Sequence, residues 1–266
     1  MLALIVYISN KGWTMKKFIY SILLVLISLT FTVTDVCAHG KKTKEGENDP
    51  KQITQSGFTH LLAGHYGSAL IEFNKALKID PNYATAYEFR GLVFRAKKQY
   101  EKAIADFDKA LKLNPKMSTA LNNKGNVHCD MQLFKEAIND YSSAISIDPN
   151  FVDAINNRGL IYLDQSQFDL AISDFTKVIE LDPKNNKTYV NRGVAYTNNN
   201  LHANAIDDFT AALNIDPKDM LALTNRGFVY LTKLDNKPLA CEDYKHACEL
   251  GGCGYYKLAV TKGYCK

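Results

Sequence analysis

The chain contains 266 residues, of which 46% are hydrophobic and 23% are charged. These proportions are ordinary for a soluble globular protein. The net charge of +4 is too small, and too evenly spread along the chain, to indicate a nucleic-acid-binding surface. We therefore expect no nucleic-acid partner.

Residues 1–38 predict an export signal. A basic start at Met15-Lys16-Lys17 is followed by the apolar run 18–33 and by a small residue, Ala38. This order is typical of a secretory signal peptide, which we expect to be cleaved after Ala38, with translation starting at Met15. The lysine pair and the plain cleavage site look bacterial, so the protein is expected in the periplasm or secreted. The alternative is an uncleaved membrane anchor at 18–33, which is slightly short for a transmembrane helix.

After residues 39–49, which predict a flexible charged linker, the sequence repeats itself every 34 residues. A glycine, an alanine, an aromatic residue and a proline recur at fixed places. They are Gly57, Gly91, Gly125, Gly159, Gly193 and Gly227; Ala69, Ala103, Ala137, Ala171 and Ala205; Phe73, Phe107, Tyr141, Phe175 and Phe209; and Pro81, Pro115, Pro149, Pro183 and Pro217. Units of equal length follow at 50–83, 84–117, 118–151, 152–185 and 186–219.

Each unit predicts an antiparallel pair of helices. Gly159 and Ala171 lack bulk, so the two backbones of the fourth unit can approach closely. Phe175 is expected to fill the space against the next unit. Pro183 ends the second helix because proline cannot continue one. A single pair leaves an apolar face bare, so successive pairs must stack into a solenoid.

The 34-residue period with this small–aromatic–proline frame resembles the tetratricopeptide repeat (TPR) family over residues 50–253. The resemblance implies an all-α fold, a right-handed superhelical solenoid of six helix-turn-helix repeats. It also implies a non-enzymatic scaffold whose concave groove holds a protein or peptide partner.

The last unit and the C-terminus depart from the frame. Unit six, at 220–253, keeps Gly227, has a loop one residue longer, and carries Pro238 where its second helix starts. Residues 255–261 predict a short final helix. Terminal units of a solenoid need an atypical cap, and we expect 254–266 to supply it.

Four of the six cysteines crowd into this end of the chain, at Cys241, Cys248, Cys253 and Cys265. In an oxidising compartment such a cluster indicates disulfides. Cys241 and Cys248 share one helix and lie about 10 Å apart, beyond disulfide reach. A final helix folded back antiparallel predicts Cys248–Cys253 and Cys241–Cys265, and the alternative is Cys241–Cys253 with Cys248–Cys265. A zinc site is disfavoured because no CxxC pair occurs. Cys129 is left as a free thiol at the groove or a helix seam.

In the TPR family the inner face is built largely from first helices. Mapping the frame onto this chain places an asparagine two residues before the glycine in four successive units: Asn123, Asn157, Asn191 and Asn225. They resemble the asparagine ladder of the O-linked N-acetylglucosamine transferase superhelix, whose amides hold a peptide backbone. An amide offers both a donor and an acceptor for that purpose. Asn122, Asn126 and Asn156 complete the candidate peptide-binding set. The alternative is that these asparagines make only local bonds or face solvent.

Two charged columns share the same spacing. The basic column is Arg90, Lys124, Arg158, Arg192 and Arg226, and the acidic column is Asp106, Asp140, Asp174 and Asp208. We interpret them as structural or solvated ion pairs of modest value. Contact of the arginines with an acidic ligand is the alternative.

From unit five onward the inner face turns apolar, at Val190, Val194, Phe228 and Leu231. This change suits an apolar side chain of a bound segment, or contact with the cap or with neighbouring repeats.

Motifs of catalysis are missing. The chain has no HExxH, no phosphate-binding glycine loop and no GxSxG nucleophile elbow. We predict no catalytic residue, metal, cofactor or small-molecule substrate, and membrane contact only if the N-terminal segment is uncleaved. The lysine position of chaperone-adaptor TPR clamps holds no basic residue here, which removes that interpretation. Alternative functions are a structural subunit of an envelope or secretion assembly, or an accessory subunit of an enzyme complex.

Overall fold

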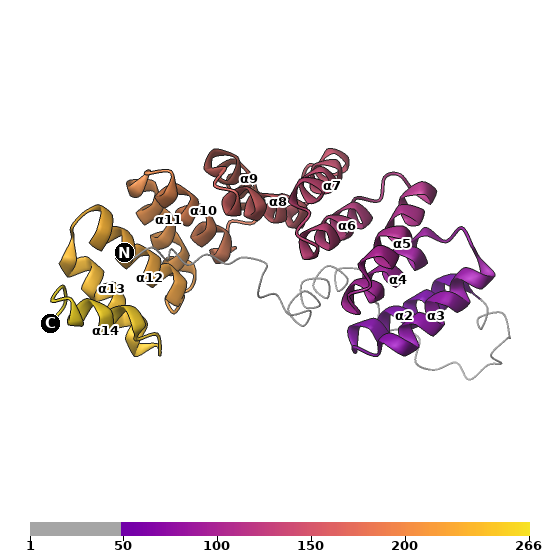
Figure 1. Ribbon diagram of the computed structural model, residues 1–266, viewed down its shortest axis with the longest axis horizontal. Helices are drawn as coiled ribbons and strands as arrows, with labels where there is room; N and C mark the ends of the chain where they lie inside the picture. The colour runs from indigo at the N-terminus through magenta and orange to yellow at the C-terminus, as the bar shows by residue number, and fades with distance from the viewer. Residues whose placement is uncertain (1–48) are drawn as a thin grey trace, which may run out of the picture. The chain divides into compact units, whose positions relative to one another are not determined.

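A computed structural model describes residues 49–266, and the predicted signal peptide and nearly all of the predicted linker lie outside this range. The described chain consists of helices, with no strand within 49–266. It divides into two larger structural units, each holding several of the repeats: one lies before Asn150 and the other from Asn150 onward. The prediction of an all-α fold built from successive helix pairs is confirmed (Figure 1).

The first unit contains three helix pairs. They are α2 (Pro50–Leu62) with α3 (Tyr66–Ile79), α4 (Ala84–Ala96) with α5 (Tyr100–Leu113), and α6 (Ser118–Asp130) with α7 (Phe134–Ile147). The second helix of one pair also packs against the first helix of the next, as α3 does on α4 and α5 on α6. This contact covers the apolar face that a single pair would leave bare.

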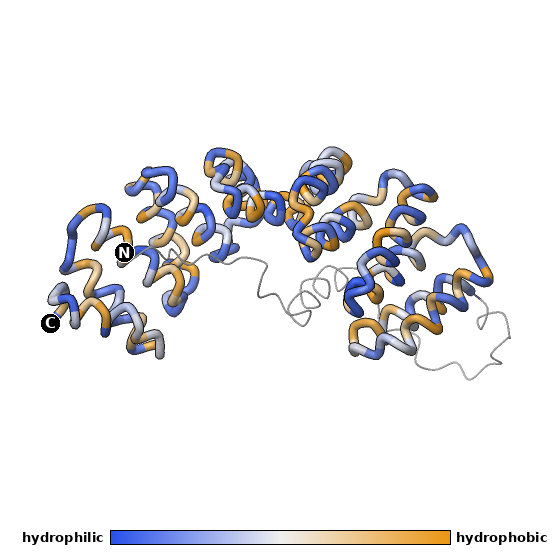
Figure 2. The backbone as a smooth tube through the Cα atoms, in the orientation of Figure 1, coloured by the Kyte–Doolittle hydropathy of each residue, from blue (hydrophilic) through white to orange (hydrophobic). Residues whose placement is uncertain are grey.

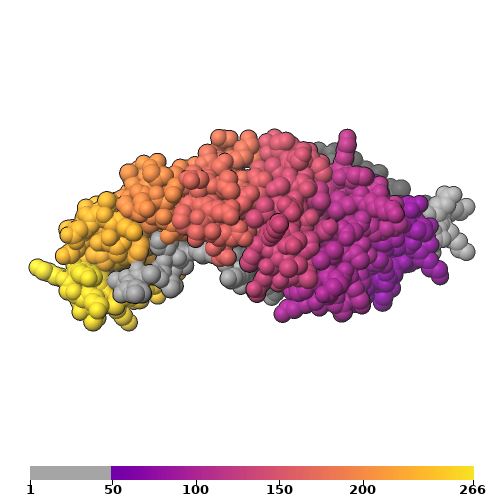
Figure 3. All heavy atoms as spheres, turned by 45° about the horizontal axis from the view of Figure 1, so that its top comes forward, coloured from indigo at the N-terminus to yellow at the C-terminus, as the bar shows by residue number. Residues whose placement is uncertain are grey.

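The second unit contains three further pairs and one short helix. They are α8 (Val152–Asp164) with α9 (Phe168–Leu181), α10 (Asn186–Asn198) with α11 (His202–Ile215), α12 (Met220–Lys233) with α13 (Lys237–Glu249), and α14 (Gly254–Thr261) on α13. Within this unit each pair packs on the next, and its colours run in sequence through orange to yellow in the space-filling view (Figure 3).

Each pair is closed by an aromatic ring lying on the frame glycine. A Cβ atom added to Gly193 would lie 2.7 Å from Cε1 of Phe209, and one added to Gly91 would lie 2.7 Å from Cε1 of Phe107. Only a glycine lets the helices approach this closely. Phe175 lies on Gly159 of its own pair in the same way, and it shares one core cluster with Val190 of the next pair.

Apolar and polar residues alternate along most helices, as the hydropathy colouring shows (Figure 2). The apolar sides form the core, in which the side chains of Phe73, Phe107, Tyr141, Phe175 and Phe209 are fully buried. In the second unit one cluster of buried side chains runs through three successive helix pairs, so the periodic pattern of the sequence builds a core that is shared between neighbouring pairs.

The sixth repeat, residues 220–253, accommodates its extra residue in a longer helix and not in the longer loop that the sequence predicts. α12 has 14 residues where α10 has 13, and three residues separate the helices in both pairs. Extending the helix keeps backbone groups paired, which an extra loop residue would not do. Pro238 lies in the first turn of α13, where the side chain of Asn236 accepts a hydrogen bond from the backbone N–H of Leu239.

Candidate protein-binding face

The first helices of successive pairs contact one another within each unit. α2 contacts α4 and α4 contacts α6, while α8 contacts α10 and α10 contacts α12. We call the side formed by these helices the first-helix face. The predicted asparagine column lies on it, because its members share one place in the first helix of each pair.

In the first unit the asparagines are engaged by the protein itself. Nδ2 of Asn123 on α6 donates to Oε1 of Glu88 on α4 at 3.1 Å, and both side chains are buried. Burial raises the pKa of Glu88 above its ordinary value. The Tyr141 hydroxyl donates to Oδ1 of buried Asn126 at 2.8 Å, and Asn122 is buried as well. These residues support the local-bond alternative more than ligand binding.

In the second unit the column differs in burial and partners. Asn157 and its neighbour Asn156 are half-buried, whereas Asn191 and Asn225 are each 3% exposed. Oδ1 of Asn191 has no hydrogen-bond partner within the described part of the chain. A buried acceptor without a donor costs about 1–3 kcal/mol. Asn191 is therefore a member of the column whose acceptor no described residue satisfies.

The four arginines of the basic column each form an ion pair inside their own helix pair. Arg90 binds Asp106 through Nε and Nη2, both at 2.7 Å, and the same two-bond geometry joins Arg158 to Asp174, Arg192 to Asp208 and Arg226 to Asp243. Hydrogen bonding to the carboxylate raises the pKa of Arg90. These guanidinium groups are thus occupied by carboxylates of their own pair, which supports the structural interpretation over an acidic ligand.

Arg90, Arg192 and Arg226 also bind the preceding pair. Nη1 of Arg192 donates to Oγ1 of Thr176 on α9 at 3.0 Å, Nη1 of Arg226 donates to Thr210 on α11 at 3.0 Å, and Nη1 of Arg90 donates to Oδ1 of Asn74 on α3. One side chain therefore ties three helices together. The sequence spacing did not predict this third bond, because it shows which residues share a column but not which neighbour a side chain reaches.

The third pair departs from this pattern. Lys124 replaces the arginine, and its Nζ lies 2.7 Å from Asp108 on the preceding second helix. Asp140 is paired with a histidine instead, its Oδ2 lying 2.6 Å from Nδ1 of His128. Burial raises the pKa of Asp140. No motif in the sequence marked His128 as a partner.

Cys129 lies at the seam of α6 and α7, with its Sγ 3.5 Å from the hydroxyl of Tyr141. Burial raises the pKa of the Cys129 thiol. The thiol is therefore held in its less reactive protonated form.

The other cysteines fix the end of the chain. Cys241 is bonded to Cys265, with Cα atoms 5.5 Å apart, and Cys248 is bonded to Cys253. The first bond holds the segment after α14 against α13, and the second spans the turn between these helices, where Gly251 has a φ of 103°. These pairs coincide with the first of the two pairings that the sequence left open.

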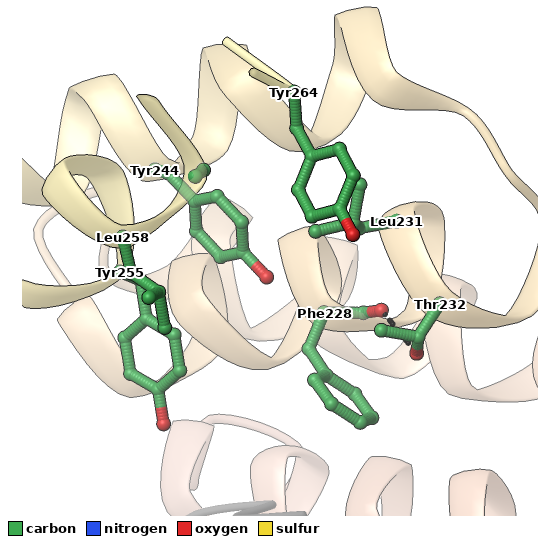
Figure 4. Close-up of a pocket in the computed structure, with 8 residues that line it drawn as sticks. Phe228, Leu231, Thr232, Tyr244, Tyr255, Leu258 and Tyr264 are labelled. Atoms are coloured by element: carbon green, nitrogen blue, oxygen red, sulfur yellow. Dashed lines mark hydrogen bonds between the residues drawn. The ribbon is translucent and has the colours of Figure 1, made fainter. Parts of the chain in front are cut away.

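A shallow apolar pocket lies among α12, α13 and α14 (Figure 4). Its walls include Phe228, Leu231, Tyr244, Tyr255, Leu258 and Tyr264. Burial raises the pKa of Tyr244 far above its ordinary value, so this phenol stays neutral. Of the four apolar residues that the sequence predicts on the inner face, Phe228, itself buried, and Leu231 line this pocket, while Val190 and Val194 lie in the core.

Residues 49–266 contain no group of three side chains able to hold a metal ion, and no helix in this range is long and apolar enough to cross a membrane.

Family models of the tetratricopeptide repeat match residues 84–117, 152–185 and 187–219, and a model of the TPR repeat matches 125–166. Similar solved structures include YrrB, described as a TPR protein with an unusual peptide-binding site. YrrB is 25% identical, and the match has a TM-score of 0.63 and covers 71% of this chain and 97% of YrrB. No curated protein matches the chain.

Two further structures have the same fold. PilF of Pseudomonas aeruginosa is 19% identical, with a TM-score of 0.69 over 82% of this chain and 100% of PilF. MamA (41-end) of Desulfovibrio magneticus RS-1 is 20% identical, with a TM-score of 0.60 over 63% of this chain and 94% of that one.

Proposed function

This chain belongs to the tetratricopeptide repeat family, and we propose that it is a non-enzymatic scaffold that binds an extended segment of a partner protein along its first-helix face. The observation that carries this proposal is the buried Oδ1 of Asn191, which lacks a donor within the described residues. A backbone N–H of a bound segment would supply that donor.

The position of Asn191 supports a peptide backbone as the ligand. Asn157, Asn191 and Asn225 occupy the same place on three successive first helices, α8, α10 and α12. A peptide backbone presents donors and acceptors at regular steps, whatever its side chains are. Amides repeated along one face match such a ligand because each offers one donor group and one acceptor. The peptide-binding site named for YrrB, a protein of the same fold, is consistent with this use of the face.

We further propose that the protein works outside the cytoplasm, in the bacterial envelope or beyond. The predicted signal peptide at 1–38 supports this location. Two disulfides among four cysteines also support it, because such bonds persist mainly in oxidising compartments.

The proposal is tested by selecting ligands for the purified protein from a random peptide library and measuring their affinity. The double variant Asn157→Ala, Asn191→Ala should bind the selected peptides about tenfold more weakly, a loss of about 1.4 kcal/mol. Its melting temperature should match that of the native protein. Asn198→Ala is the matched control, since Asn198 is an exposed residue of the same helix α10 and lies outside the column.

Unchanged affinity with a lowered melting temperature would show that the asparagines are structural and would overturn the proposal. A stoichiometric complex with one partner, undisturbed by the double variant, would instead favour the assembly-subunit alternative.

A further inference from the structure

The pocket among α12, α13 and α14 continues the first-helix face beyond the asparagine column. Asn225 and Phe228 are three residues apart on α12, so their side chains lie on the same side of the helix, one turn apart. Phe228 lines the pocket. A segment bound along this face would therefore bring its next side chains to the pocket.

The pocket wall is mainly aromatic, and part of it is open to solvent. The rings of Phe228, Tyr244, Tyr255 and Tyr264 lie around it (Figure 4). Tyr255 stacks on Tyr244 with ring centroids 5.6 Å apart. Leu258 is 38% exposed and Tyr264 is 37% exposed, although both lie beside buried apolar groups. Such a wall gains free energy when an apolar group covers it.

The pocket is a shallow depression, not an enclosed ligand site. Its empty space of about 270 Å³ includes open solvent. Small-molecule sites usually enclose most of their ligand. A depression of this kind offers an apolar surface that one large side chain can cover, and it does not enclose a whole small-molecule ligand.

The C-terminal wall of the pocket carries positive charge. Every charged side chain from Gly254 to the end of the sequence is a lysine, namely Lys257, Lys262 and Lys266. Lys262 follows Leu258 by four residues and so lies on the same side as this pocket residue. Nζ of Lys237 lies 5.7 Å from the ring centroid of Tyr264.

Two nearby carboxylates are already paired. Asp243 is buried and bound twice by Arg226, and Asp235 pairs with Lys237 at 3.9 Å, so the unbalanced positive charge is that of the lysines in 254–266. Glu242 is two residues from Tyr244 and so lies on the other side of α13. A ligand with carboxylates beside its apolar group would complement this surface.

We infer that this pocket binds one aromatic or large aliphatic side chain of the partner segment, flanked by acidic residues. The inference rests on the proposed function, and it adds the chemistry of the partner. The asparagine column would hold the backbone without regard to sequence, and the pocket would select the segment. The disulfide Cys241–Cys265 keeps the pocket complete, since Tyr264 directly precedes Cys265.

The probe is a fluorescein-labelled peptide with one central Phe between glutamates in a Gly-Ser background, and anisotropy reports its binding. Two comparison peptides carry Ser in place of Phe, or Lys in place of Glu. We expect each change to weaken binding about tenfold, as loss of a buried ring or of charge complementarity would. Leu258→Asp should weaken binding of the Phe peptide by a similar factor and abolish its advantage over the Ser peptide.

Val260→Asp is the matched control. Val260 lies on the same helix and is 41% exposed, but it does not line the pocket. The control should bind like the native protein, so a loss with Leu258→Asp alone cannot arise from charge on α14 in general.

Asn191→Ala separates the two proposals. It should weaken the Phe and Ser peptides equally and leave their ratio unchanged. If only the peptide-backbone proposal fails, Asn191→Ala has no effect while Leu258→Asp still abolishes the preference for Phe. If only the pocket inference fails, Asn191→Ala weakens binding while Phe and Ser peptides bind equally to the native protein.

The inference is overturned if the Phe–Glu peptide does not bind, or if Val260→Asp and Leu258→Asp behave alike. It is also overturned if phosphatidylcholine vesicles containing phosphatidylglycerol bind through Leu258 while no peptide does, because the surface would then recognise a membrane.

Discussion

At the scale of single residues, the close contact between frame glycine and aromatic ring makes a sharp prediction for Gly193. A Cβ at this position would meet Cε1 of Phe209 at 2.7 Å and two more ring atoms at 3.0 Å. Overpacking a core costs about 1–3 kcal/mol, and the better helix propensity of alanine returns at most about 1 kcal/mol. Gly193→Ala should therefore lower the free energy of unfolding, measured by urea denaturation, by up to about 2 kcal/mol after this return.

Gly67→Ala provides the control for this prediction. Gly67 lies in the first turn of α3, and a Cβ there would meet nothing within 4 Å. This variant should keep or slightly raise stability, by up to about 1 kcal/mol. Equal losses in the two variants would show that ring contact is not the reason for the frame glycine.

The buried carboxyl of Glu88 predicts a pH-dependent effect. Burial raises its pKa above the ordinary value of 4.5, so the folded state holds this proton more tightly than the unfolded state. Its contribution to stability is present below the ordinary pKa and is lost as the pH rises through the folded pKa. Glu88→Gln keeps an acceptor for Asn123 and removes the ionisation.

The Glu88→Gln variant should therefore melt at a higher temperature than the native protein at neutral pH, and the difference should shrink toward about pH 4. Thermal melts at a series of pH values measure this. Glu101→Gln, an exposed change on α5, should show little difference at any pH. A neutral-pH loss with Glu88→Gln would mean that the ionised carboxylate stabilises the fold.

Residue-level contacts were only partly predictable from the sequence. Equal spacing placed Arg192 and Asp208 in matching columns, and the ion pair followed because both ends are fixed by the same frame. The same reasoning failed in the third pair, where Lys124 reaches Asp108 and leaves Asp140 to His128. A compact ammonium group lacks the planar fork that binds one carboxylate with two bonds, so its choice of partner depends on local geometry.

At the scale of elements, the disulfide Cys241–Cys265 should decide whether α14 stays on α13. The bond closes a loop with a sequence separation of 24, and constraining a loop of this size is worth about 3 kcal/mol. Cys241→Ser with Cys265→Ser should increase hydrogen exchange in 254–266 while the amides of α8 to α11 keep their protection. Helices in a repeat array contact only their neighbours, so the loss should remain local.

Cys248→Ser with Cys253→Ser is the comparison for this element. Its loop has a separation of only 5, so its removal should have a smaller effect on exchange in α14. Protection of 254–266 that survives loss of both disulfides would contradict the proposal that this segment caps the array through its cysteines.

The elements were the most predictable level. A 34-residue period fixes where each helix can start and end, because each glycine of the repeat frame must meet an aromatic ring and each proline of the frame must follow a helix. The extra residue before Pro238 was less predictable, since both a longer loop and a longer helix satisfy the frame. The aromatic pocket was not predictable, because Tyr255, Leu258 and Tyr264 lie outside the repeat and meet Phe228 only after the chain turns back at Gly251.

At the scale of the whole molecule, the proposed location outside the cytoplasm predicts two covalent features: a cleaved N-terminus and two disulfide bonds. If export occurs, the chain recovered from cells begins at His39 and its mass is lower by four hydrogens than that of the fully reduced chain, because each of the two disulfides removes two. Only the thiol of Cys129 should then remain for alkylation without reductant, and slowly, because it is half-buried.

Intact mass spectrometry with and without reductant tests location and disulfides together. A chain that still carries 18–33 would indicate the membrane-anchored alternative, and five free thiols in the chain from His39 would place the protein in a reducing compartment. Free thiols would also mean that the disulfide Cys241–Cys265 is absent, so that it would no longer hold the neighbouring Tyr264 in the pocket wall. Affinity for the Phe–Glu peptide should therefore fall when the exported protein is reduced. If affinity is lost in step with the disulfides, the oxidising compartment, the fold of the C-terminal segment and peptide binding depend on one another.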